Sequence, residues 1–173
     1  MAATWAARNQ TYGEGADALT WTDPLAHGLV TSLSASGLAW QGQSLLDSDP
    51  EYGTDSVRPE WMDARRDGWA VTSGYMGLPV TFATPVPRTI QGEAAGGGDG
   101  FVGLIDAELA LQCAYWLPGP GVERVRAVLA DDGSIAVIGA VDEITLEPGT
   151  VREVTIHGAQ KDGFIAYFTP PTP

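Results

Sequence analysis

The chain has 173 residues, of which 44% are hydrophobic and 18% charged, and this balance predicts one globular domain over residues 1–173. Its 22 acidic and 9 basic side chains give a net charge of −13, so we expect neither a nucleic-acid partner nor an anionic membrane partner. The single cysteine, Cys113, excludes an intramolecular disulfide, and no apolar run approaches the ~18 residues of a membrane span.

The N-terminal segment 1–16 contains only two aromatic side chains, Trp5 and Tyr12. It has too few large apolar residues to build a core of its own. We therefore expect it to pack against the body of the protein, or against a neighbouring subunit, through Trp5.

Four β-like runs are the main signal in the first half of the chain. Apolar residues that alternate, or run together between turn formers, are typical of strands. The first two runs flank a turn at 35–37, so they predict a hairpin. The four runs cover residues 29–34, 38–45, 69–72 and 78–82.

Residues 47–69 are mostly polar, with seven acidic side chains and three arginines. We expect a long surface loop here, with one helical turn at most near 59–62, and a loop of this length is usually functional. The alternate acids at 47–55 resemble the start of a calcium loop. However, Pro50 lies where that loop must curl, and Arg58 replaces its bidentate Glu. We therefore interpret the acids as solvated, and we predict no metal and no cofactor.

A glycine-rich run at 94–100 is the candidate boundary between two lobes of the domain. Downstream, apolar alternation predicts strands at 101–105 and 108–117, with a helix over 106–115 as the alternative. The Pro-Gly-Pro-Gly run at 118–121 ends either element.

The C-terminal third, 122–168, gives the clearest pattern. Short β-rich runs separated by turn formers predict a meander of four or five antiparallel strands. Its turns are expected at Asp132-Gly133, Pro148-Gly149 and Asp162-Gly163. Taken with the earlier runs, this pattern predicts a mostly β fold, an antiparallel β-sandwich or barrel with long loops and at most short helices.

Residues suited to catalysis are few and scattered. Neither His27 nor His157 lies near a nucleophile motif, and Cys113 stands in an apolar alternating run that predicts burial. Asp106 and Glu108 would lie about 7 Å apart on one strand face, as a glycosidase pair would, but two exposed acids near a strand start explain them as well. We therefore expect no catalytic residues.

The six tryptophans carry more information than the acids. Trp61 and Trp69 flank a polar stretch that contains Arg65 and Arg66, and Trp and Arg are the residue types that interfaces favour. We predict that these four residues, together with Trp5, form a binding surface. In the alternative interpretation, the two arginines only neutralise neighbouring aspartates on a surface turn.

These observations favour a non-catalytic structural or assembly protein that acts through protein–protein contacts, either with copies of itself or within a larger assembly. The abundance of Arg over Lys suggests a GC-rich genome, and a capsid or tail component of a bacteriophage virion suits a small acidic β-rich chain. Two other classes stay open: a carbohydrate-binding module, which needs coplanar exposed aromatics, and a hydrolase whose site is scattered in sequence.

Overall fold

Antiparallel strands make up every regular element that the structure describes. The computed structural model describes residues 2–6, 11–12, 19–20, 27–33, 40–48, 57–76, 80–82, 88–90, 99–108, 110–120, 124–146 and 154–169. No helix occurs within these ranges, so the mostly β prediction is confirmed. Closure of the whole chain into a sandwich or barrel, and the single domain over 1–173, stay predictions.

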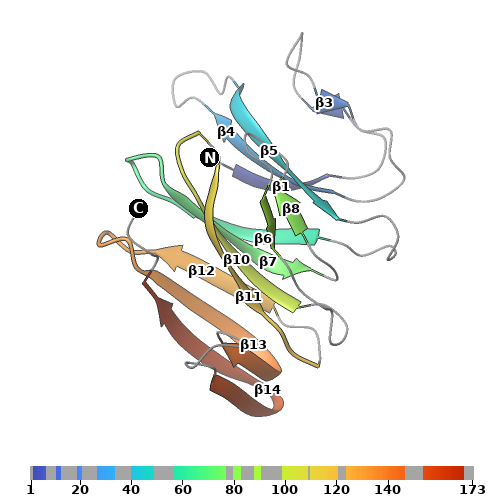
Figure 1. Ribbon diagram of the computed structural model, residues 1–173, viewed down its shortest axis with the longest axis vertical. Helices are drawn as coiled ribbons and strands as arrows, with labels where there is room; N and C mark the ends of the chain where they lie inside the picture. Colours follow the sequence, from blue (N-terminus) through green and yellow to red (C-terminus); the bar gives the residue numbers. More distant parts are fainter. Residues whose placement is uncertain are drawn as a thin grey trace.

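The strands form four sheets (Figure 1). The five-stranded sheet has the order β1 (Ala2–Ala6), β4 (His27–Leu33), β5 (Trp40–Ser48), β8 (Val80–Phe82) and β9 (Arg88–Ile90). The four-stranded sheet has the order β11 (Leu111–Leu117), β10 (Asp99–Ile105), β7 (Ala70–Met76) and β6 (Val57–Ala64). The three-stranded sheet is β12 (Arg124–Leu129), β13 (Ile135–Leu146) and β14 (Val154–Phe168), and β2 (Thr11–Tyr12) pairs with β3 (Leu19–Thr20).

One hydrophobic cluster of the described core lies between the four-stranded and three-stranded sheets. Period-two alternation places every second side chain of β12 inward, and its burial strictly alternates between exposed and buried. The four-stranded sheet supplies Val71, Val102, Leu104 and Leu117, and the three-stranded sheet supplies Val125, Ala127, Leu129, Ile135, Val137, Phe164 and Phe168. Burial of these apolar side chains is what holds the two layers together.

Two glycines are required by the geometry of the three-stranded sheet. Gly133 has φ +85° in the β12–β13 turn, where Gly133 N–H donates to the Ala130 carbonyl and Ala130 N–H donates to the Ser134 carbonyl. At Gly139 a Cβ atom would come closer than any van der Waals contact to the Phe164 ring. The missing side chain therefore lets Phe164 cross over β13 into the core.

Several turn and strand predictions are confirmed. β4 pairs with β5 as the expected hairpin, and the turn at Asp132-Gly133 joins β12 to β13. β10 and β11 are strands, so the helix over 106–115 is excluded. The turn at Pro148-Gly149 lies outside the described residues, as do positions 94–98 of the expected lobe boundary.

The loop predicted at 47–69 is wrong in its described part. Asp47 and Ser48 end β5, and residues 57–64 form β6, so no helical turn occurs at 59–62. Pro59 is tolerated because β6 is the edge strand of its sheet and its register shifts between Pro59 and Trp61, as at a β-bulge. Only a short turn at 65–69 connects β6 to β7.

The C-terminal meander has three described strands, where four or five were expected. Asp162 and Gly163 do not reverse the chain. Both lie inside β14, where they pair with Val141 and Ala140 of β13. The register shifts between Val141 and Glu143, because β14 has more residues than β13 at this point. Gly163 does not adopt the positive φ that a tight Asp-Gly turn requires, so the turn signal misled here.

Candidate protein-contact surface

One face of the three-stranded sheet exposes large apolar side chains. The register places alternate residues of β12, β13 and β14 on this outer face, opposite the buried core. Val128 is 42% exposed, Ile138 47%, Ile165 65% and Tyr167 76%. We call the surface formed by Arg124, Arg126, Val128, Ala136, Ile138, Ala140, Ile165 and Tyr167 the exposed sheet face.

Neighbouring strands bring these side chains together. Arg126 pairs with Ile138, which in turn pairs with Ile165, while Val128 and Tyr167 both lie opposite Ala136. Side chains directly opposite one another on adjacent strands lie about 5 Å apart at Cβ. The exposed apolar groups are therefore one continuous patch, and patches of this kind on a protein surface mark contact sites.

Trp61 borders this face from β6. Its side chain is 40% exposed, and the Arg126 guanidinium stacks 5.1 Å from the ring centroid. The next arginine along β12, Arg124, lies 5.6 Å over the Tyr75 ring, and its Nη1 is 3.9 Å from Glu60 Oε1. Cation–π contacts hold both arginines against the four-stranded sheet, so a partner would meet preordered side chains there.

The free edge of β12 is capped by side chains of the four-stranded sheet. Ala127 N–H donates to Ser73 Oγ at 2.9 Å, and Leu129 N–H donates to Asp63 Oδ2 at 3.0 Å. Ser73 is fully buried. These acceptors satisfy N–H groups that a bare edge strand would offer to another chain.

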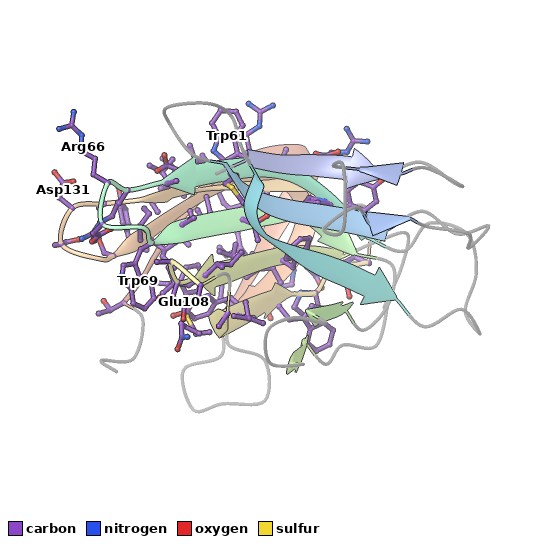
Figure 2. The ribbon with its side chains drawn as sticks, turned by 90° about the horizontal axis from the view of Figure 1, so that it is seen from above. Trp61, Arg66, Trp69, Glu108 and Asp131 are labelled. Carbon is purple, nitrogen blue, oxygen red and sulfur yellow. The ribbon has the colours of Figure 1, made fainter. Side chains whose placement is uncertain are left out.

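The predicted site residues do not form one surface. Trp69 is half-buried and packs against the described core, whereas Trp61 is exposed on the other side of the molecule (Figure 2). The backbone of Trp5 pairs with Gly28 in β1 and β4, so the N-terminal segment does join a sheet. The side chain of Trp5 lies outside the described residues.

Arg65 and Arg66 differ in their surroundings. Arg65 Nη1 donates to the Ala130 carbonyl at 3.2 Å, and its Nη2 lies 2.5 Å from Asp67 Oδ2, so it ties the β6–β7 turn to the β12–β13 turn. Arg66 is exposed at the same hairpin tip, near Asp131 (Figure 2). The alternative interpretation, in which the arginines neutralise neighbouring aspartates, therefore describes Arg65. Within the described residues Arg66 makes no ion pair.

A pocket of about 510 Å³ opens at this tip. It is lined by Asp63, Ala64, Arg65, Arg66, Asp67, Leu129 and Asp131. Asp63 and Arg65 already bond to backbone groups of β12 and its turn. Few of its charged groups are left for a ligand.

Other polar groups have structural partners. Asp99 is buried and accepts hydrogen bonds from Trp116 Nε1 at 2.8 Å and Gly119 N–H at 3.3 Å, while burial raises its pKa above the ordinary value. Asp106 accepts N–H groups of Glu108 and Ala110, so these acids belong to a turn and do not share a strand face.

An exposed cross-strand pair joins His157 Nδ1 and Glu143 Oε2 at 2.6 Å. Among the described side chains, no three or more His, Cys, Asp or Glu residues gather closely enough to hold a metal ion. No helix in the described part of the chain is long and apolar enough to span a membrane.

The sequence interpretation missed Val128, Ile138, Ile165 and Tyr167 as surface residues. For the last three a signal was available in the runs 135–138 and 164–168, which are apolar on both strand faces. Such runs are typical of strands that are covered on both sides. Here one side is the core, and the described residues leave the other side exposed.

Comparison with known proteins finds no matching family model, no similar curated protein and no similar solved structure.

Proposed function

We propose that this chain is a non-catalytic assembly protein whose contact element is the exposed sheet face. The observation that carries the proposal is the exposure of four large apolar side chains, Val128, Ile138, Ile165 and Tyr167, on one face of one sheet. Leaving such a patch in water has no benefit to an isolated domain, while covering it on association stabilises a complex.

The charge of the face favours a protein partner that is acidic. Arg124 and Arg126 are its only charged residues, although the chain as a whole carries a net charge of −13. Opposite potentials across an interface steer encounter and select partners. Acidic regions of further copies of the same chain supply that complement, so self-association is the form of assembly that we propose. A capsid or tail component of a bacteriophage is its specific case.

The test is the weight-average mass of the protein over a concentration series, measured by sedimentation velocity. We expect the wild type to associate, and Ile138→Lys to weaken association because it places a charge at the centre of the face. Arg66→Lys, at the β6–β7 hairpin tip outside the exposed sheet face, keeps its charge; it is the control and should associate like the wild type.

A wild type that stays monomeric at every concentration would contradict the proposal. In that case a glycan array tests the carbohydrate-binding alternative directly. Equal association of Ile138→Lys and wild type, with unchanged thermal melting, would show that the contact lies elsewhere.

A further inference from the structure

The two edges of the three-stranded sheet are not equivalent. The β12 edge is capped by Ser73 and Asp63, as described above. β14 is the opposite edge, and within the described residues no strand pairs with its far side (Figure 1). An unpaired edge presents a row of N–H and C=O groups that can template pairing with another chain.

The hydrogen-bond alternation identifies which residues of β14 face outward. Ala130 and Ser134 are a hydrogen-bonded pair at the hairpin end, so every second residue of β13 from Ser134 onward bonds to β12. The intervening residues of β13 bond to β14. Their partners there are Phe164, Ala166 and Phe168. The backbone groups of Gly163, Ile165 and Tyr167 therefore point to the free side, which we call the open edge.

The open edge has the sequence character of a pairing strand. Residues 163–168 contain no charge and no proline, and they are rich in aromatic and β-branched side chains. Two of the three residues of the open edge, Ile165 and Tyr167, also have exposed side chains on the outer face. Natural edge strands are usually protected by charges or prolines, and here these lie only beyond the segment, at Asp162 and Pro170.

We propose that a second copy of this chain pairs with the open edge, β14 against β14, antiparallel and centred on Ile165. This inference rests on the proposed self-association but assigns it a separate element. In this register Ile165 lies opposite Ile165 of the second copy, and Gly163 lies opposite Tyr167. All outward backbone groups of the three residues then find partners at once.

The charges permit this pairing between two acidic chains. The same register pairs residues 163–167 of the two copies with each other, and this stretch contains no charged residue, so no like charges lie directly opposite each other there. Like charges directly opposite are destabilising in a sheet, and their absence favours a second copy as the occupant. Because the other edge of each sheet is capped, the pairing closes as a dimer and does not continue into a fibre.

A matched pair of variants separates edge pairing from contact through the exposed sheet face. Ile165→Pro replaces the isoleucine side chain with a proline ring and removes the outward N–H, which makes no bond to β13. Ile165→Ala removes most of the same side chain and keeps the N–H. We expect Ile165→Ala to form dimers and Ile165→Pro to be monomeric under the same conditions, with both variants folded by thermal melting.

Site-directed cross-linking tests the register. Residues in a hydrogen-bonded antiparallel pair have Cα atoms about 5.5 Å apart, which is within the disulfide range of about 4.4–6.8 Å. Ile165→Cys treated with a mild oxidant should therefore form a disulfide-linked dimer in high yield. The wild type, with Cys113 alone, and Arg66→Cys, at the β6–β7 hairpin tip off the open edge, are the controls and should stay unlinked.

The outcomes distinguish the two proposals. Fast linkage at position 165 with loss of dimers in Ile165→Pro supports edge pairing. Association without linkage at position 165, and with Ile165→Pro equal to Ile165→Ala, overturns edge pairing and leaves the proposed function intact. A monomeric wild type overturns both.

Discussion

The two edges of the three-stranded sheet differ in how their backbone groups are satisfied. At β12, the N–H groups of Ala127 and Leu129 bond to Ser73 and Asp63 of the packed layer. At β14, no described strand pairs with the open edge, and the strand is uncharged over 163–168. An edge capped within the chain and an edge left for another chain can thus coexist on one sheet, and the difference indicates where assembly begins.

The largest expected effect sharpens the contrast between the inner and outer faces of this sheet. Ile135 is fully buried, so Ile135→Ala should lower the free energy of unfolding by about 2–5 kcal/mol, through lost burial and a residual cavity. Ile165→Ala on the outer face should change it by no more than about 0.5 kcal/mol in the monomer. Urea denaturation of both variants at low protein concentration measures the two changes. Similar losses of unfolding free energy in the two variants would contradict the contrast between the faces.

The capped edge predicts the next largest effect. Ser73→Ala leaves the buried Ala127 N–H without its acceptor, which should cost about 1–3 kcal/mol of unfolding free energy. Ser73→Thr keeps a hydroxyl at the position and is the matched control for the lost hydrogen bond. A loss below about 0.5 kcal/mol in urea denaturation of Ser73→Ala would mean that the cap contributes little to holding β12 in place.

Arg65 and Arg66 are neighbours in sequence with different expected effects. Arg65→Ala removes the donor to the Ala130 carbonyl and the ion pair with Asp67, and we expect about 1 kcal/mol of lost stability. Arg66→Ala should lie within about 0.5 kcal/mol of the wild type. Equal melting temperatures for the two variants would show that Arg65 does not join the two hairpin tips.

The smallest expected effect is a change in pH dependence at Asp99. Burial raises the pKa of this carboxyl, so the native state holds the proton more tightly than the unfolded chain does. The contribution of Asp99 to stability is therefore greatest below its ordinary pKa of 3.8 and declines as pH rises through the raised value.

Asp99→Asn has no proton to lose. The stability of the wild type relative to Asp99→Asn should therefore fall as pH rises from about 4, in urea denaturation at a series of pH values. Parallel pH profiles would contradict the assignment.

Local sequence patterns predicted much of the fold, since alternation and turn formers are recorded along the chain itself. The β4–β5 hairpin and the Asp132-Gly133 turn follow from such patterns. β6 was missed because Pro59 and its acidic neighbours suppress the strand signal, and only its position at a sheet edge makes them acceptable.

The candidate site was harder to predict, because exposure depends on which layers pack together. Trp61 and Trp69 look alike in sequence, yet one is exposed and the other packs against the core. Arg65 looked like a contact residue, and its partner Ala130 is 65 residues away along the chain. The exposed sheet face could not be distinguished from a second core face until the layers were known.

Hydrogen exchange of individual backbone amides tests the contrast between the two edges most directly. The amides of Ala127 and Leu129 should be protected at every protein concentration, since their acceptors belong to the same chain. The amides of Ile165 and Tyr167 should exchange fast in dilute protein and slow as concentration rises and the second copy pairs with β14. Protection of Ile165 and Tyr167 that does not change with concentration, whether high or low, would contradict the account.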